Sequence, residues 1–437
     1  MKILINQLRN QASFKHVSLP QLCKGDFDYA SFFAAKIQQK KLDNSYRVFK
    51  RIQRDNARFP VAMETSKDPK SITIWCSNDY LGLGSHPRVI ETIKDVLTKH
   101  GSGSGGSRLI SGNSRYHEEL EVELAKYHQK ESCLVFSSGY VANHTALHTL
   151  GTVLPDLHYF SDAGNHASII MGVRTSPAHK QVFRQNSPAH LEEVLGQADQ
   201  GVPKIVVFET VHSMDGSIAP VERMCDVAHK FGALTFVDEV HAVGMYGDTG
   251  SGVGERDNCI DKMDVISSTL GKSFGVMGGY IAGGADLVDV VRSYGSGFIF
   301  TTALPPHVMA GCLQSLKILQ SAEGKELREK LHDNAAYLKR ELEAANIPCI
   351  PGNSQVIPVM VGDAHASMRL TNDLVERFGI YVQAINYPSV PRGTERLRVA
   401  PTPHHTKLMM DRFVDCLSLL WKEHNLPFAQ KDASKGR

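Results

Sequence analysis

The sequence predicts an α/β protein: a large domain with a mostly parallel sheet between helices, followed by a smaller C-terminal α+β domain. From about residue 87 to 330, short apolar runs alternate with amphipathic stretches, a pattern typical of parallel sheets with helices on both faces. The apolar runs are nearly continuous and end in polar residues, as strands buried on both faces do. After a long helical stretch at 325–346, two further strand-like runs precede a final helix.

The first elements are an arm, a short strand and a helix. Residues 27–58 are rich in Lys, Arg and Gln with apolar residues at helical spacing, so we expect helical N-terminal structure. The stretch 71–83 predicts a short strand entering a turn, and 86–100 predicts a helix that begins at Pro87.

Five apolar runs are expected to form strands of the main sheet, with helices such as ERMCDVAHKFG (222–232) between them. These runs are CLVFSS (133–138), DLHYFSD (156–162), KIVVFET (204–210), ALTFVDE (233–239) and DVISST (264–269). The C-terminal domain is predicted from the strands QVIPVMVG (355–362) and ERLRVAP (395–401) and the helix LMMDRFVDCLSLLW (408–421). We therefore expect an N-terminal helical arm at 1–75, a large domain at 76–318, a small domain at 319–425 and a tail at 426–437.

The composition excludes several classes of function. A net charge of +2 over 437 residues is too balanced to indicate nucleic-acid binding. No run of 18 apolar residues is present, so no membrane span is expected. The eight cysteines form no C-x-x-C pair and there is no H-E-x-x-H motif, so we expect no metal site and a reducing compartment. The first 25 residues are basic and resemble a mitochondrial presequence only weakly.

The segment GSGSGGSRLISG (101–112) matches the glycine spacing of a dinucleotide-binding turn. Such a turn must follow a strand and open a helix. Here a predicted helix precedes the glycines, so Gly101 is expected to be its C-cap, and a dinucleotide site is disfavoured. The glycines are instead expected to let the backbone bend sharply or approach a ligand.

Unusual polar residues follow the predicted strands, where α/β proteins bind ligands. Asp238 is the first charge after a buried run, and His241 follows it; a buried carboxylate needs a cation, which a protonated pyridine would supply. Lys272 lies just past the next strand, after Thr269 and in a glycine-flanked turn, where loss of solvation lowers an amine's pKa and makes it nucleophilic.

Two further strand ends complete this pattern. His166 lies in a turn after a strand, and Gly139 and Tyr140 open a helix whose N-terminus favours a phosphate. Each residue alone has an ordinary structural explanation as a cap, a solvated lysine or a structural histidine. Together, a pyridine site, a phosphate site and a reactive amine describe pyridoxal 5′-phosphate (PLP).

Several longer motifs carry a family resemblance. VDEVHAVGMYG, TLGKSFG, SDAGNHASII, ETVHSMDG and GFIFTTALPP resemble the α-oxoamine synthases, PLP enzymes of the type I aminotransferase fold. YRVFKRIQR, WCSNDYLGL and INYPSVPRGTERLRVAPTPHH are most similar to the 5-aminolevulinate synthases of that family. The resemblance spans about residues 46–421 and implies a seven-stranded sheet and a homodimer with the active site at the subunit interface.

The resemblance also implies roles for the residues already singled out. Lys272 would bind PLP covalently and take the α-proton of glycine. Asp238 would keep the pyridine nitrogen protonated, His241 would bind the ring oxygen, and His166 would stack on the ring and donate a proton to the acyl carbonyl.

Phosphate, cofactor-oxygen and carboxylate contacts are implied in the same way. The phosphate would be held by Gly139, Tyr140, Thr269 and by Thr302 of the partner subunit. Ser213 would lie near the cofactor oxygen, and Arg398, assisted by Asn78, would clamp the glycine carboxylate.

The implied reaction joins glycine to succinyl-CoA and gives 5-aminolevulinate, CoA and CO2, a step toward tetrapyrroles and haem. Arg47 and Ser107 would bind the succinyl carboxylate. The remaining implied substrate contacts are Ser161 and Lys180 to CoA, and Ser389.

Three residues depart from the usual pattern. Leu109 stands where asparagine is usual, and Ser107 and Ser389 stand where threonine is usual. The loss of the asparagine amide keeps open an α-oxoamine synthase that uses a different acyl-CoA. Two further hypotheses are a plain aminotransferase and a catalytically silent binding partner. We expect a bacterial cytoplasm, with the mitochondrial matrix as the second choice of compartment.

Overall fold

A computed structural model describes residues 27–429, and the chain forms two compact units, Met1–Val48 and Phe49–Arg437. The basic residues at 1–26 and the last part of the expected tail, 430–437, lie outside the described residues. In the first unit, α2 (Tyr29–Leu42) is capped by Asp28, whose side chain accepts a hydrogen bond from the Ser31 amide. The expected N-terminal helix is therefore confirmed over this range.

The second unit is built on a seven-stranded sheet in the order β4-β10-β9-β8-β7-β5-β6. All neighbouring pairs are parallel except those of β10, which runs antiparallel to β4 and β9. The strands are β4 (Ser132–Phe136), β5 (His158–Asp162), β6 (His179–Phe183), β7 (Lys204–Glu209), β8 (Leu234–Asp238), β9 (Val265–Thr269) and β10 (Gly279–Gly283). The predicted mostly parallel sheet is confirmed, and all five predicted runs are among its strands.

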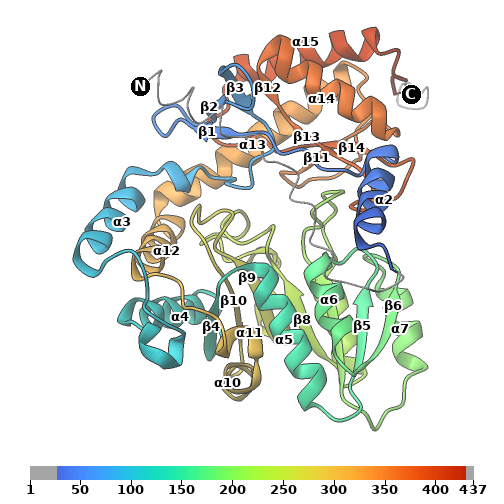
Figure 1. The fold of residues 1–437 in the computed structure, drawn as a ribbon. Helices are drawn as coiled ribbons and strands as arrows, with labels where there is room; N and C mark the ends of the chain where they lie inside the picture. Colours follow the sequence, from blue (N-terminus) through green and yellow to red (C-terminus); the bar gives the residue numbers. More distant parts are fainter. Residues whose placement is uncertain (1–26, 430–437) are drawn as a thin grey trace. The chain divides into compact units, whose positions relative to one another are not determined.

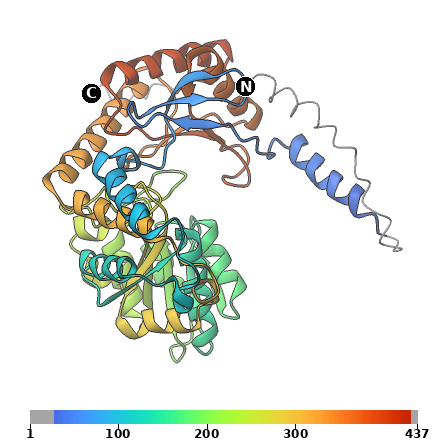
Figure 2. The same ribbon diagram turned by 60° about the vertical axis from the view of Figure 1, so that its left-hand side comes forward.

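Helices cover both faces of this sheet (Figures 1 and 2). The helices of this region are α3 (Pro87–His100), α4 (Arg115–Tyr127), α5 (Gly139–Val153), α6 (Ala167–Thr175), α7 (Pro188–Gly196), α8 (Val221–Lys230), α9 (Val253–Arg256), α10 (Ala285–Tyr294), α11 (Ser296–Ile299) and α12 (Pro306–Leu319). Helix α3 begins at Pro87 and ends at Gly101, which has a φ of 81°, so the predicted C-cap glycine is confirmed.

The C-terminal region forms a smaller lobe of helices and short strands. Its helices are α13 (Ala322–Ala344), α14 (Ala364–Phe378) and α15 (Lys407–Glu423), and its three-stranded sheet has the order β11 (Ile357–Met360), β14 (Arg396–Val399), β13 (Gln383–Ile385). The two predicted strands and the closing helix are confirmed.

Residues 52–74 do not continue the N-terminal helix. They form β1 (Ile52–Arg54), β2 (Val61–Glu64) and β3 (Lys70–Ile74), and β3 pairs in parallel with β12 (Ile380–Tyr381) of the C-terminal lobe. Burial of Ile72 and Ile74 against Val375 explains this pairing, because it removes apolar side chains from water. The helical prediction for 43–58 is wrong, and the division at residues 76 and 319 stays a prediction.

Between residues 27 and 429, no helix combines the length and the apolar character needed to cross a bilayer. The same residues contain no group of three or more His, Cys, Asp or Glu side chains suited to a metal ion.

Candidate active site

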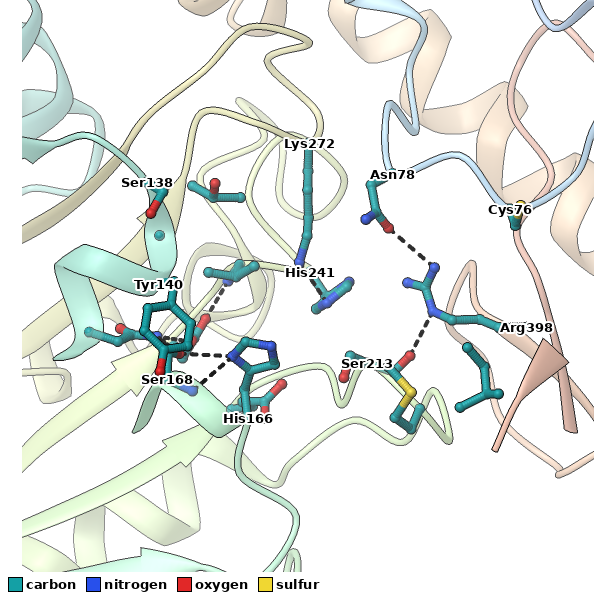
Figure 3. A pocket seen from close by; sticks show the side chains of 18 of the residues that line it. Cys76, Asn78, Ser138, Tyr140, His166, Ser168, Ser213, His241, Lys272 and Arg398 are labelled. Atoms are coloured by element: carbon teal, nitrogen blue, oxygen red, sulfur yellow. Dashed lines mark hydrogen bonds between the residues drawn. The ribbon is translucent and has the colours of Figure 1, made fainter. Parts of the chain in front are cut away.

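A cavity of about 460 Å³ lies where the carboxyl ends of β7, β8 and β9 meet the N-terminus of α5 and the strands β13 and β14 (Figure 3). Ten of the sixteen predicted site residues line it. They are Asn78, Gly139, Tyr140, His166, Ser213, Asp238, His241, Thr269, Lys272 and Arg398. The cavity therefore joins the main sheet to the C-terminal lobe.

Lys272 points toward His241 inside the cavity (Figure 3), and the distance from its Nζ to His241 Nε2 is 2.7 Å. The Tyr80 hydroxyl lies 2.8 Å from the other ring nitrogen, Nδ1, and accepts a hydrogen bond from Arg398. Because the arginine can only donate, Tyr80 keeps its own proton for His241 Nδ1. The neutral imidazole then carries its hydrogen on Nε2 and donates it to Lys272, which requires an uncharged amine.

The electrostatic surroundings of Lys272 agree with an uncharged amine. Burial and, second to it, the nearby Arg398 charge lower the pKa of Lys272 to about 7, against the opposing charges of Asp238 and Glu209. Burial, followed by the charges of Lys272 and Arg398, lowers the pKa of His241 well below its usual value. The lysine is thus a nucleophile near neutral pH.

Asp238 ends β8 as a buried carboxylate, 3% exposed. Its Oδ1 accepts from the Val240 amide at 2.8 Å and its Oδ2 from Asn143 Nδ2 at 2.7 Å. Burial raises the pKa of Asp238, although these two hydrogen bonds and the Lys272 charge oppose the increase. A cation next to Asp238 would therefore stabilise the ionised carboxylate, and the carboxylate would stabilise the cation.

His166 is fixed by the same network. Asn143 Nδ2 also donates to Ser168 Oγ at 3.0 Å, and Ser168 Oγ lies 2.8 Å from His166 Nδ1. The Ser168 amide donates to the same Nδ1 at 3.2 Å. Nδ1 is thus an acceptor, and the neutral ring carries its hydrogen on Nε2. Burial lowers the pKa of His166 and keeps that ring neutral.

The first turn of α5 provides a site for an anion. Ser138 caps the helix by accepting from the Val141 amide at 3.2 Å. The backbone N–H groups of Gly139 and Tyr140 have no acceptor among residues 27–429, and both residues line the cavity. Free N–H groups at a helix N-terminus bind phosphate. Thr269 Oγ1 donates to the Gly278 carbonyl at 2.9 Å, so it must turn to donate to a phosphate.

Arg398 comes from β14 of the C-terminal lobe and is 6% exposed. It donates from Nε to the Ser213 carbonyl at 2.8 Å, from Nη1 to Asn78 Oδ1 at 3.2 Å, and from Nη2 to Tyr80. A guanidinium has five N–H donors, so one on each terminal nitrogen has no partner in the described part of the chain. Two such parallel donors fit a carboxylate.

The other six predicted site residues do not line the cavity. Ser107 and Thr302 form a β-bridge with each other, and Thr302 lines a smaller cavity with Arg108. Ser161 is buried on β5 and accepts from Asn165 at 2.9 Å. Lys180 and Ser389 are exposed, and Arg47 belongs to the other compact unit.

In the glycine-rich segment 101–112, two stretches of backbone approach each other closely. A Cβ at Gly106 would lie 2.0 Å from the Ile110 carbonyl oxygen, and one at Gly112 would lie 2.2 Å from the Gly106 oxygen. Only glycine allows these backbone segments to approach so closely. Leu109 and Ile110 project from the loop and are 86% and 71% exposed.

Sequence reasoning missed three residues that shape this site. Glu209 ends β7 directly beside Asp238 and lines the cavity, and it repeats the signal of a first charge after an apolar run. Burial, followed by the Asp238 charge, raises the pKa of Glu209 far above its usual value. Asn143 and Tyr80 act through partners 95 and 161 positions away in the chain, respectively, which no local pattern reveals.

Comparison with known proteins identifies the family. The model of the family "Aminotransferase class I and II" matches residues 70–417. The chain is 54% identical, over 92% of its length and 69% of the relative's, to the erythroid-specific mitochondrial 5-aminolevulinate synthase of Opsanus tau. It is 53% identical to the human one, with the same coverage. A serine palmitoyltransferase from S. paucimobilis, solved with a bound PLP derivative, superposes with a TM-score of 0.84 at 30% identity, over 91% of this chain and all of the other.

The cavity fits PLP on its own geometry. A buried carboxylate with no cation hydrogen-bonded to it from residues 27–429, two free amides at a helix N-terminus and a neutral lysine surround one space. PLP is the cofactor of this protein, and the type I aminotransferase-like fold is confirmed. The chain belongs to the α-oxoamine synthases and, within them, to the 5-aminolevulinate synthase family.

Proposed function

We propose that the protein condenses glycine with succinyl-CoA, forms 5-aminolevulinate and releases CoA and CO2. The identity of 54% over 92% of the chain to a 5-aminolevulinate synthase supports this reaction. The observation that carries it is Arg398, a buried guanidinium that lines the same cavity as Lys272 and has two N–H groups without a partner among residues 27–429. That pairing suits an amino acid whose carboxylate is held while its α-carbon is deprotonated.

The chain's own residues have defined tasks in this reaction. Bound PLP supplies an electron sink for the negative charge that develops at the α-carbon. Lys272 Nζ takes the glycine α-proton, and His166 Nε2–H donates to the acyl carbonyl oxygen. Asp238 would hold the proton of the pyridine nitrogen. Asn143 fixes the positions of Asp238, directly, and of His166, through Ser168.

The acyl-CoA contacts extend the proposal beyond the cavity. We assign Arg47, Ser107 and Ser389 to the succinyl end, and Ser161 and Lys180 to CoA. The expected homodimer would bring Thr302 of the partner subunit to the phosphate. As for compartment, the mitochondrial relatives favour the matrix over the bacterial cytoplasm that the sequence alone suggests.

A second candidate is the same condensation with another acyl-CoA. The exposed Leu109 and Ile110 support it, because an apolar loop suits an apolar acyl chain. The 54% identity to a 5-aminolevulinate synthase favours succinyl-CoA.

A panel of acyl-CoA thioesters with purified PLP-loaded protein and glycine separates the candidates. We expect kcat/KM for succinyl-CoA to exceed that for acetyl- and octanoyl-CoA by about tenfold or more, measured by thiol release and product mass. Arg47→Leu should reduce the succinyl-CoA value about tenfold and leave glycine KM within about twofold. A preference of the parent for octanoyl-CoA would select the second candidate.

A further inference from the structure

The side-chain amide of Gln355 ties the C-terminal lobe to the backbone of His241. Gln355 is fully buried and does not line the cavity. Its Nε2 donates to the His241 carbonyl at 2.9 Å, and its Oε1 accepts from the Tyr246 hydroxyl at 2.8 Å. An amide suits this position because it donates and accepts from one planar group.

His241 is thereby held at three points. Its Nδ1 is bound by Tyr80, its Nε2 lies 2.7 Å from Lys272 Nζ, and its carbonyl is bound by Gln355. No other donor reaches that carbonyl from within residues 27–429. The first two contacts fix the ring plane, and the third fixes the backbone from which the ring projects.

The segment that carries Gln355 is itself anchored. Lys339 on α13 donates to the carbonyl oxygens of Gly352 and Ser354, at 2.7 Å and 2.5 Å. On the other side, the Tyr246 ring contacts His332 of α13 at a centroid distance of 4.9 Å. Both ends of the Gln355 contact therefore lead to one helix, α13, of the C-terminal lobe.

We propose that Gln355 is a positioning residue that sets the orientation of His241 and, through it, the protonation and reach of Lys272. Gln355 touches neither cofactor nor substrate and acts only through the His241 carbonyl. The inference rests on the proposed function only for the kinetic half of its test.

Gln355→Met keeps the side-chain length and removes both hydrogen bonds. We expect the pH midpoint of the visible absorbance of the PLP-loaded protein to move by about half a unit or more, because that absorbance reports on the nitrogen of Lys272. We also expect kcat to fall about tenfold, with glycine KM within about threefold because Arg398 is untouched.

Gln355→Glu gives a sharper signature, since an ionised carboxylate accepts from Tyr246 but cannot donate to the His241 carbonyl. Protonation restores the donor, so kcat of Gln355→Glu relative to the parent should rise as the pH falls. The titratable groups around this position are Tyr246, His241, His332, Arg256 and Lys339. These groups titrate in the parent as well, so the ratio of the two kcat values at each pH reports the titration of the side chain at position 355.

Asn334→Leu is the matched control, because Asn334 is also a side-chain amide that makes two hydrogen bonds, here from its Nδ2 to the carbonyls of Thr402 and His405, each at 2.9 Å. This control variant should lower the unfolding temperature and leave the pH midpoint of the absorbance unchanged.

The inference is overturned if folded Gln355→Met keeps both the midpoint and kcat of the parent, or if Asn334→Leu shifts the midpoint equally. If Gln355→Met does not fold, Gln355→Glu decides by the presence or absence of its pH-dependent ratio. If the parent makes no 5-aminolevulinate, the proposed function fails while the absorbance midpoint still tests Gln355.

Discussion

Lys272 illustrates, at the scale of one residue, how a functional group opposes folding. Its amine is buried and its pKa is lowered from 10.5 to about 7. Between these two values the unfolded chain binds a proton that the folded chain has released. The stability of the folded protein therefore rises with pH across this window, and the residue costs most stability below about pH 7.

We expect Lys272→Met to raise the unfolding temperature of the PLP-free protein by a few degrees at pH 7 and by less at pH 10. The reason is that a buried apolar side chain needs no desolvation of a charge, and that this advantage fades as the unfolded lysine also becomes neutral. Differential scanning calorimetry of the variant and the parent at the two pH values measures this difference in unfolding temperature. Lys317→Met, on an exposed lysine of α12, should shift neither value. An equal gain at both pH values would show that the charge of the lysine is not the cause.

Single residues were predictable where the chemistry follows a local signal. Asp238 and Lys272 stand at or just after the ends of apolar runs, and the structure brings both to one cavity. Glu209 carries the same signal and could have been predicted with them. Gln355 and Asn143 could not be found from sequence, because their importance lies in partners 114 and 95 positions away.

At the scale of elements, strands whose side chains are mostly buried were predictable, including the edge strand β4, whereas the exposed edge strand β6 and the glycine-bounded β10 were not. The strands β7 and β9 are buried along their whole length, so their sequences carry no charge between the ends and consist of apolar residues and, in β9, small hydroxyl residues. Strand β6 lies at the sheet edge with mostly exposed side chains, and β10 has glycine at both ends. The strands β1 and β2 pair with their neighbours in sequence, but they were missed because they are only three and four residues long and most of their side chains are not fully buried.

The turn after β9 illustrates how two elements constrain each other. Gly275 has a φ of +68°, and a Cβ there would lie 2.0 Å from the Gly84 nitrogen. We expect Gly275→Ala to lower the free energy of unfolding by about 3 kcal/mol or more and to weaken PLP binding, because the turn carries Lys272.

Gly232→Ala separates steric overlap from backbone strain. Gly232 has a similar φ of +66°, but no atom lies within 4 Å of the position that a Cβ would take. Its substitution should cost only about 1–2 kcal/mol, the strain of a left-handed backbone. Urea unfolding of both variants measures the difference, and equal costs would show that the contact with Gly84 relaxes freely.

At the scale of the whole molecule, the expected dimer makes a prediction about shared sites. Thr302 lies outside the cavity of its own chain, and we assign it to the partner's phosphate. Lys272→Ala and Thr302→Ala should each be nearly inactive alone. A hybrid dimer of the two contains one site with both native residues, so mixing and refolding equal amounts should restore about a quarter of parental activity.

The unmixed variants, refolded in the same way, are the controls for this experiment. No recovery in a mixture that contains hybrid dimers would show that Thr302 serves its own chain. Native mass spectrometry measures the hybrid fraction.

The position of Arg398 has a consequence for synthesis on the ribosome. Every strand of the seven-stranded sheet has been translated by Gly283, whereas the guanidinium that meets Asn78, Tyr80 and Ser213 arrives 115 residues later. Because domains fold in the order in which they emerge, the nascent chain can acquire its lysine and carboxylate pocket well before it can hold an amino acid. A polypeptide that ends between Gly283 and Arg398 would have the residues that hold PLP but would lack the guanidinium that holds the amino acid.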